Sequence, residues 1–346
     1  MLRDAFGREI DYLRISVTDR CNLRCVYCMP PQGIEWKARS EILTYEEITT
    51  VVRAAAALGI RKIRLTGGEP LVRPAIERLV EMVAAVSGIQ DVSLTTNAVL
   101  LDRHAEPLAR AGLRRVNVSL DTLRPDRFEQ ITRFGRIADV WRGLQAAESA
   151  GLAPIKLNAV LVRGMNDDEL ADLARLTLDH TWHVRFIELM PVANEGDWGD
   201  PLRVPPPGHR LVTAEEMQSR LSTQLGLPDL FAEARLASSA VPGNGPARVF
   251  RLPNAKGTLG FITPVSQHFC PTCNRLRLTA DGKLRPCLLT DGEVDVMSAL
   301  RSKASDAEVQ ALLARAVENK PERHRLNEEI APAELIGQRV MAQIGG

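Results

Sequence analysis

The first half of the chain alternates short apolar stretches with longer amphipathic ones. Thr44 precedes two glutamates and fits a helix N-cap, and Gly59 follows the same stretch and fits a helix C-terminus. Strands that are separated by helices of this length predict a series of parallel βα units. The expected strands are Leu13–Val17, Lys62–Thr66, Val92–Thr96, Arg115–Leu120, Ile155–Leu161 and His183–Ile187, and the expected helices are Thr44–Leu58, Pro74–Val86, Arg103–Ala111, Ile137–Ala150 and Asp167–Leu178.

Polar side chains recur at every second position of these strands, and side chains two residues apart on a strand share one face. Parallel strands covered by helices are normally apolar on both faces, and an ordinary (β/α)8 barrel fills its interior with apolar layers. A polar, basic interior instead indicates a wide lumen that holds water or an anionic ligand. An antiparallel sheet with one solvated face is the alternative, which the intervening helices disfavour. The polar positions are Arg14, Ser16, Thr18, Lys62, Arg64, Thr66, Ser93, Thr95, Asn97, Asn117, Ser119, Asp121, Lys156, Asn158, His183 and Arg185.

The pattern changes after Met190. Asn194 to Gly208 is rich in Gly, Pro and Asp and predicts a loop, a helix is expected at Thr213–Leu225, and Asp281-Gly282 predicts a hairpin turn. We therefore predict an α/β fold, with an incomplete (β/α)6 TIM-type barrel at residues 1–190. A β-containing C-terminal extension at residues 191–346 would close the open side of that barrel. Its expected strands are Arg248–Leu252, Gly257–Ile262, Leu276–Thr279 and Lys283–Arg285.

Composition narrows the class of protein. The chain has 346 residues with 45% hydrophobic content, which is ample for a large core. A formal net charge of +1 and an aromatic content of 4% disfavour a nucleic-acid binder. No apolar run approaches the roughly 20 residues of a transmembrane helix, and the first residues lack the apolar segment of a signal peptide. We therefore expect a cytoplasmic protein.

Six cysteines fall into two groups of three. A reducing cytoplasm disfavours structural disulfides, so metal binding is the better interpretation. Cys21, Cys25 and Cys28 form a Cys-x3-Cys-x2-Cys motif after the first strand, where α/β barrels build active sites. Thiolates are the usual ligands of iron–sulfur clusters, and three of them would leave one iron of a cubane open. A zinc site is the alternative, but zinc would need a fourth ligand, and none is close by.

The first motif resembles the signature of the radical S-adenosylmethionine (SAM) superfamily. Gly67-Gly68-Glu69-Pro70 follows the second strand and matches that family's Gly-Gly-Glu-Pro motif. Tyr27 matches the aromatic residue that precedes the last cysteine. The resemblance implies a [4Fe–4S] cluster whose open iron binds SAM and whose electron generates a 5′-deoxyadenosyl radical.

The second motif consists of Cys270, Cys273 and Cys287, with the spacing Cys-x2-Cys-x13-Cys. On spacing alone, nearby His268 makes a Cys3His zinc site a fair alternative. The motif narrows the resemblance to the family of GTP 3′,8-cyclases, lyases that begin molybdenum-cofactor biosynthesis and carry two [4Fe–4S] clusters. The general superfamily has no second cysteine set of this kind. The other matching segments are Leu13–Asn22, Arg64–Pro70, Asn117–Asp121, Lys156–Asn158, Arg185–Glu188, Cys273–Arg277 and Gly345-Gly346.

The resemblance assigns roles to residues along the whole chain. A lone Arg or Lys is more often a solvated surface charge. Several of the family's GTP-binding positions, however, fall on the polar strand faces, and guanidinium groups suit phosphate oxygens. Cys21, Cys25 and Cys28 would hold the first cluster, and Cys270, Cys273 and Cys287 the second. The SAM-binding positions are Tyr27, Gly68, Ser119 and Met190, and the GTP-binding positions are Arg14, Arg64, Thr95, Lys156, Arg185, Arg275, Leu276 and Arg277.

The resemblance also implies the chemistry. The radical would remove the ribose 3′ hydrogen of GTP, the sugar carbon would attack guanine C8, and reduction would give 3′,8-cyclo-7,8-dihydro-GTP. Arg275, Arg277 or the second cluster would assist the final reduction, and the sequence leaves the choice open. Gly345 and Gly346 would enter the active site, where residues without side chains fit a narrow channel. A terminus without a role is the alternative.

Partners follow from the same resemblance. GTP is the expected substrate, cyclic pyranopterin monophosphate synthase the next enzyme, and a homodimer the family's common state, while nothing indicates the electron donor. No nucleic-acid or membrane partner is expected. The alternative functions are another twin-cluster radical SAM enzyme and a zinc-binding structural protein. Ala98 follows Asn97 where the family usually has Gly, which predicts a tighter turn there.

Overall fold

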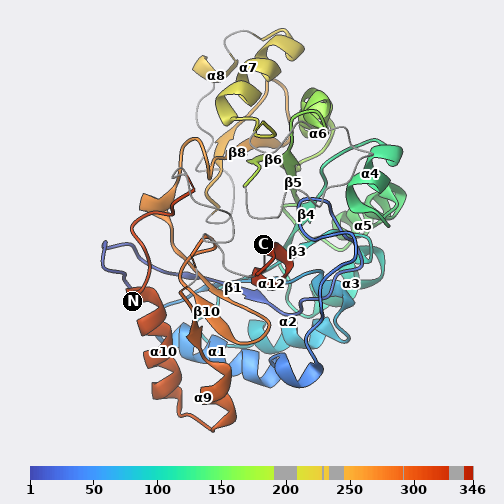
Figure 1. Ribbon diagram of the computed structural model, residues 1–346. Helices are drawn as coiled ribbons and strands as arrows, with labels where there is room; N and C mark the ends of the chain where they lie inside the picture. Colours follow the sequence, from blue (N-terminus) through green and yellow to red (C-terminus); the bar gives the residue numbers. More distant parts are fainter. Residues whose placement is uncertain (191–208, 228–229, 234–244, 291, 327–338, 346) are drawn as a thin grey trace.

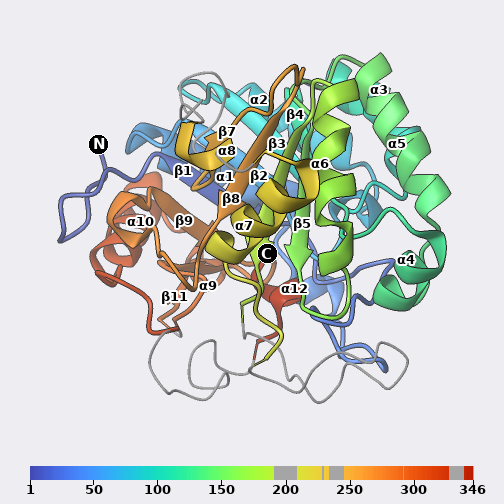
Figure 2. The ribbon, with the colours of Figure 1, turned by 90° about the horizontal axis from the view of Figure 1, so that it is seen from above.

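The alternation of polar and apolar positions gives one curved sheet an apolar face and a polar face. The computed structural model describes residues 1–190, 209–227, 230–233, 245–290, 292–326 and 339–345. Ile63 and Leu65 of the second strand are fully buried, and they belong to the large apolar cluster between sheet and helices. Figures 1 and 2 show the helices arranged around the outside of the sheet. The opposite, polar face turns inward, as the sequence predicts.

The six expected strands of the first half are confirmed and lie side by side in chain order. Within the described residues the sheet has eleven strands, ordered β11-β10-β9-β1-β2-β3-β4-β5-β6-β8-β7. Every pairing from β9 to β8 is parallel, whereas β10, β11 and β7 pair antiparallel. The strands are β1 (Tyr12–Ser16), β2 (Lys62–Thr66), β3 (Asp91–Thr96), β4 (Arg115–Ser119), β5 (Lys156–Leu161), β6 (His183–Glu188), β7 (Arg248–Phe250), β8 (Thr258–Ile262), β9 (Arg275–Leu278), β10 (Lys283–Arg285) and β11 (Val294–Asp295).

The C-terminal half adds strands to both edges of this sheet. β9 pairs with β1, and β8 pairs with β6, so strands from either side of residue 190 share one ladder. β11 and β7 form its two edges in the described part of the chain, so the ladder stays open. The fold is therefore a partial TIM-type barrel, as expected. The domain boundary at residue 190 stays a prediction, and the loop predicted at Asn194–Gly208 lies outside the described residues.

Helices connect the parallel strands on the outer face. Thr44 caps the first of them, because its hydroxyl accepts the Glu47 N–H while the Glu47 carboxylate accepts the Thr44 N–H. None of the described helices is long and apolar enough to cross a membrane. The helices are α1 (Tyr45–Ala57), α2 (Ile76–Ala84), α3 (Leu101–Arg110), α4 (Pro125–Thr132), α5 (Ile137–Ser149), α6 (Leu170–Asp179), α7 (Ala214–Leu225), α8 (Leu230–Glu233), α9 (Met297–Arg301), α10 (Asp306–Glu318) and α12 (Met341–Ile344).

Several short elements, among them α4, α8, β11 and α12, were not expected from the sequence. Helix α4 begins at Pro125 with only eight residues, and β11 has only two. Short elements carry little periodic signal, which explains why they were missed. The expected helix at Asp167–Leu178 divides into a 3-10 turn, Asp167–Glu169, and α6. The expected hairpin turn at Asp281-Gly282 is confirmed, because Gly282 has a φ of +72° and β9 pairs antiparallel with β10.

The turn after β3 is shaped by Ala98. This residue takes a φ of +61°, in the left-handed region that glycine tolerates better, so the departure from the family's Gly coincides with local backbone strain. Gly143 of α5 packs directly on the turn, since a Cβ at Gly143 would lie 2.3 Å from the Ala98 carbonyl oxygen. Helix α5 can therefore approach β3 closely only with glycine at this position.

We expect Gly143→Ala to lower the free energy of unfolding by about 1–3 kcal/mol, because the added methyl overpacks the contact with Ala98. Chemical denaturation of the full chain measures this change. Gly292→Ala is the matched control, because Gly292 is exposed and its Cβ would meet only one atom, at 4.0 Å. The control should change stability by no more than about 0.5 kcal/mol. Equal stability of the two variants would contradict the packing argument.

Candidate active site

A cavity of about 290 Å³ opens along the polar face of the sheet. Its wall includes the segments that follow β2, β3 and β4, so it lies at the C-terminal ends of the parallel strands, where barrel enzymes place their sites. The structure brings most of the predicted site residues together there. The lining includes Arg14, Arg64, Thr95, Arg185, Arg275 and Arg277, together with Tyr27, Gly68, Ser119, Met190, Cys21, Cys25 and Cys28.

The arginines of the lining are held against one another by strand register. Arg14 of β1 lies opposite Arg64 on one side and Arg277 on the other. Burial and the neighbouring Arg277 and Arg64 lower the pKa of Arg14 well below its usual value. Burial likewise lowers the pKa of Arg277 to about 10 and that of Arg185 to about 9. Arg185 and Arg277 still carry charge at pH 7, so this part of the cavity wall is positive.

Several polar atoms on this wall lack a hydrogen-bond partner within the described residues. Arg64, Arg185 and Arg275 each leave a buried Nε donor unsatisfied. Buried donors of this kind are costly unless a ligand completes them. The Nε donors suit an anion. The unsatisfied amide oxygen of Asn158 is an acceptor, and it suits a donor such as the amino group of a base. The neutral atoms of this set are Thr95 Oγ1 and Asn158 Oδ1.

Two predicted GTP-binding residues lie off the cavity wall. The Leu276 side chain is fully buried in the apolar cluster beneath the sheet, opposite Leu13, so only the backbone of Leu276 is left for a ligand. Lys156 is buried at the polar face between Asn117 and His183. Burial, with Arg185, Arg115 and Arg64, lowers the pKa of Lys156 to about 6. This lysine is therefore mostly neutral at pH 7 in the free protein.

The first three cysteines lie together on the cavity wall. The Leu23 N–H donates to Cys21 Sγ at 3.4 Å, and the Ala342 backbone N–H donates to Cys28. Burial raises the pKa of Cys21 to about 12 and that of Cys28 to about 11. A metal centre would therefore displace thiol protons here. Donors directed at the sulfurs and a short loop fit an iron–sulfur cluster.

Gly67 and Gly68 bring the chain after β2 against the segment before Cys21. A Cβ on Gly68 would lie 2.3 Å from the Arg20 carbonyl oxygen, and one on Gly67 would lie 2.6 Å from that of Thr18. Glu69 then ties this turn to β3, because its carboxylate accepts hydrogen bonds from the backbone N–H of Leu71, the Thr96 hydroxyl and the Asn97 N–H. Burial raises the pKa of Glu69 to about 7. The glycines therefore fix the backbone beside the first cysteine set.

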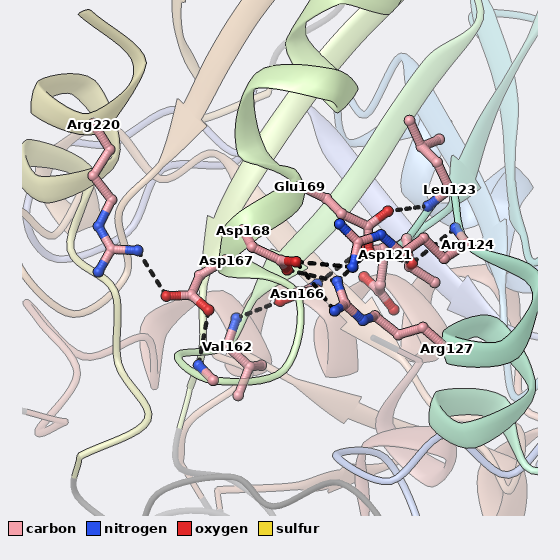
Figure 3. Close-up of polar contacts among 12 residues, drawn as sticks. Asp121, Leu123, Arg124, Arg127, Val162, Asn166, Asp167, Asp168, Glu169 and Arg220 are labelled. Carbon is pink, nitrogen blue, oxygen red and sulfur yellow. Dashed lines mark hydrogen bonds and ion pairs between the residues drawn. The ribbon is translucent and has the colours of Figure 1, made fainter. Parts of the chain in front are cut away.

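Tyr27 has a partner that the sequence did not reveal. Its hydroxyl donates to the Asp121 carboxylate, whose other oxygen accepts the Val160 N–H at 2.8 Å. Asn166 supports the same residue from behind, since its Nδ2 donates to the Asp121 carbonyl oxygen at 2.7 Å (Figure 3). Glu169 belongs to the same group of polar contacts, because its carboxylate accepts the Leu123 N–H. The polar strand pattern had included Asp121, but no pattern pointed to Asn166.

The second cysteine set is also gathered in space, and its thiols interact electrostatically with one another. Each thiol accepts one backbone N–H. The described residues contain no group of three His, Cys, Asp or Glu side chains that could hold a single metal ion. A cubane would bind each of the three thiolates to a different iron. The donors are His324 to Cys270, Arg275 to Cys273 and Leu289 to Cys287.

The C-terminal tail reaches the cavity through Met341 and Ala342, and the predicted role of Gly345 and Gly346 stays a prediction. Met341 and Ala342 line the wall, and Figures 1 and 2 show α12 inside the curve of the sheet. The Arg277 guanidinium donates to the Gly345 carbonyl oxygen at 2.6 Å. Arg339 anchors the tail to the hairpin turn through Asp281 at 3.0 Å and to Glu293 at 2.7 Å. Gly346 lies outside the described residues.

Solved structures share this fold. The chain is similar to "anSMEcpe with bound AdoMet" with a TM-score of 0.57 and 14% identity, covering 92% of this chain and 79% of that one. It is also similar to Streptococcus suis SuiB bound to precursor peptide SuiA, with a TM-score of 0.56 and 14% identity. That match covers 96% of this chain but 66% of SuiB, so the chain spans less than two thirds of that protein. These likenesses concern the fold alone.

Family models and curated relatives are more specific. The model described as the radical SAM superfamily matches residues 15–177, and the model described as Molybdenum Cofactor Synthesis C matches residues 182–326. A GTP 3′,8-cyclase from Pelotomaculum thermopropionicum is 50% identical over 346 residues, and one from Moorella thermoacetica is 49% identical over 348, each covering 100% of both chains. One from Heliobacterium modesticaldum is 51% identical over 344 residues, covering 99% of both chains. The chain therefore belongs to the GTP 3′,8-cyclase family within the radical SAM superfamily.

Proposed function

We propose that this protein converts GTP to (8S)-3′,8-cyclo-7,8-dihydroguanosine 5′-triphosphate, the first step of molybdenum-cofactor biosynthesis. The observation that carries the proposal is one cavity that joins the first cysteine set to a wall of buried arginines. A radical generator and a polyanion site thus share a single chamber. Family membership supports the same reaction, a lyase that joins ribose C3′ to guanine C8.

Cys21, Cys25 and Cys28 would hold a [4Fe–4S] cluster, with SAM beside Tyr27, Gly68, Ser119 and Met190. When bound, this group supplies an electron that cleaves SAM and gives the radical that takes the C3′ hydrogen of GTP. The protein's own residues hold SAM in place and exclude water from the chamber. Gly67 and Gly68 hold the turn after β2 against the segment before Cys21, beside the position expected for the methionine moiety, and the Asp121 contact fixes the Tyr27 ring. Met341 of the tail narrows the chamber against water.

GTP would lie along the arginine wall. Arg14, Arg64 and Arg277 are adjacent on β1, β2 and β9, so their guanidinium groups present a continuous row of donors to the triphosphate. Thr95, Lys156 and Arg185 would complete the substrate site, with Leu276 contributing backbone only. The unsatisfied Nε atoms of Arg64, Arg185 and Arg275 support this assignment.

The second cysteine set, Cys270, Cys273 and Cys287, would hold the other [4Fe–4S] cluster near the guanine. Arg275 follows Cys273 by two residues and lines the chamber, which supports this placement. Arg277 is tied to the Gly345 carbonyl, so Arg275, Arg277 and the tail would act together on the substrate. The final reduction would take place beside them.

The proposed cellular setting rests on membership of the family. The product would pass to cyclic pyranopterin monophosphate synthase, and the enzyme would work in the cytoplasm as a homodimer. A low-potential electron donor is required.

GTP carrying deuterium at C3′ tests the reaction directly. We expect deuterium in the 5′-deoxyadenosine that the anaerobic, reconstituted enzyme releases, because the C3′ hydrogen is the one abstracted. Mass spectrometry of the nucleoside measures it, and GTP deuterated at C8 serves as the control. Unlabelled 5′-deoxyadenosine with C3′-labelled GTP would show that the abstraction site is wrong.

The lowered pKa of Lys156 predicts that the enzyme takes up a proton when GTP binds. The free enzyme holds its pKa at about 6, so Lys156 is largely neutral at pH 8. A bound triphosphate raises that pKa, so GTP binding should take up close to one proton at pH 8 and less near pH 6. Affinity should accordingly weaken as pH rises. Isothermal calorimetry in buffers of different ionisation enthalpy measures the uptake.

Two lysine variants test the source of the proton, one at Lys156 and a matched control at Lys303. Lys156→Met should lose the uptake, whereas Lys303→Met, at an exposed position, should keep it. An uptake that persists in Lys156→Met would assign the proton to another group.

Deletion of Gly345-Gly346 tests the tail. We expect both clusters to remain, because the described thiol contacts do not involve these glycines, while cyclisation falls by about 10²-fold or more through loss of the Arg277 contact. Iron content, visible absorption and product formation distinguish the two effects. Normal turnover by the shortened enzyme would refute a role for the tail.

A further inference from the structure

Lys320 is a buried cation that neither the family motifs nor the mechanism above uses. It follows α10, and only 4% of its surface is exposed. Its Nζ donates to the Arg275 carbonyl oxygen at 2.9 Å and to the Pro286 carbonyl oxygen at 2.6 Å. It also donates to the Cys273 sulfur.

These contacts connect the two segments that carry the second cysteine set. Arg275 follows Cys273 by two residues, and Pro286 directly precedes Cys287. Arg8 holds the third segment in a similar way, because its guanidinium donates to the Cys270 carbonyl oxygen at 2.9 Å. The three cysteines are therefore positioned by two cations from distant parts of the chain.

The charge of Lys320 is the second part of the argument. Within the described residues no carboxylate lies at ion-pair distance from its Nζ, unlike Arg8, which pairs with Asp4. A buried ammonium without a counter-charge is strongly unfavourable. Cluster-bound thiolates next to Nζ would supply the missing negative charge.

We propose that Lys320 is a positioning residue for the second cluster, which spaces its cysteines and supplies the positive charge that sets its reduction potential. The proposal rests on the proposed function, since it requires a cluster at this cysteine set. A fixed positive charge beside a cluster stabilises the reduced, more negative form, so the charge raises the reduction potential. Lys320 thereby favours electron acceptance near the substrate.

The test uses the full chain with Cys21, Cys25 and Cys28 replaced by Ala, so that only the second cluster is reconstituted. Three Lys320 variants separate its two roles. Lys320→Met removes donors and charge, Lys320→Gln keeps donors without charge, and Lys320→Arg keeps both. Lys303→Met is the exposed control. Redox titration followed by electron paramagnetic resonance gives the potential, and iron release to a chelator gives cluster retention.

We expect Lys320→Met to bind the cluster about 10- to 100-fold more weakly and to have a more negative potential. Lys320→Gln should retain the cluster but keep the negative shift, and Lys320→Arg should resemble the parent in both. Lys320→Gln also decides the charge argument if Lys320→Met fails to fold. A potential in Lys320→Gln equal to that of Lys303→Met would overturn the proposal.

Failure of the proposed function gives a different result. If the parent with the triple Ala replacement binds zinc or no iron, the second cluster itself is absent and the proposed function fails in its two-cluster form. If it binds about four irons and the Lys320 variants behave like the control, only the role of Lys320 fails.

Discussion

Mutual repulsion among buried cations is the constraint around which this structure is organised. Arg14, Arg64 and Arg277 stand side by side on adjacent strands, and the lowered pKa values of Arg185 and Lys156 show how strongly burial acts on the group. Such charges stay in place only because the apolar outer face, packed against helices, holds the strands rigid. The fold thus maintains an electrostatic imbalance that an anionic ligand relieves, which is how a preorganised site gains affinity.

The pairing of β1 with β9 makes this imbalance possible. It places Arg275 opposite Tyr12 and Arg277 opposite Arg14, so the segment between Cys273 and Cys287 lies beside the strand that precedes the first cysteine set. The chamber is thereby lined by the first cysteine set and by Arg275 and Arg277, which neighbour the second set in the sequence. The tail adds a third contributor, because Arg277 contacts Gly345 while Arg339 holds the approach through Asp281 and Glu293. Radical chemistry needs such enclosure, since water and stray hydrogen donors would quench it.

The sequence predicted the parallel strands, the polar lumen and both cysteine sets, because each leaves a local, periodic or fixed-spacing signal. It did not predict that Leu276 points away from the cavity, since two neighbouring residues on a strand necessarily face opposite sides and the family motif names positions, not directions. Asn166, Asp121 as the partner of Tyr27, and Lys320 were missed for another reason. Their roles depend on contacts between segments far apart in the chain, and single polar residues carry no pattern of their own. Helix α4 and β11 were too short to detect.

The same strand pairing bears on how the chain folds. Asn274 at the start of β9 bonds to Asp11 at the start of β1, and these residues are 263 positions apart. Contacts of such long range form late, because closing a large loop is entropically unfavourable before other contacts stabilise it. Until β9 docks, β1 is an unpaired sheet edge next to the first cysteine loop, and exposed edges invite aggregation. During synthesis the N-terminal βα units therefore cannot complete the sheet until the last quarter of the chain has been made. A cluster that assembles before β9 docks would lie beside an exposed strand edge and an incomplete row of arginines.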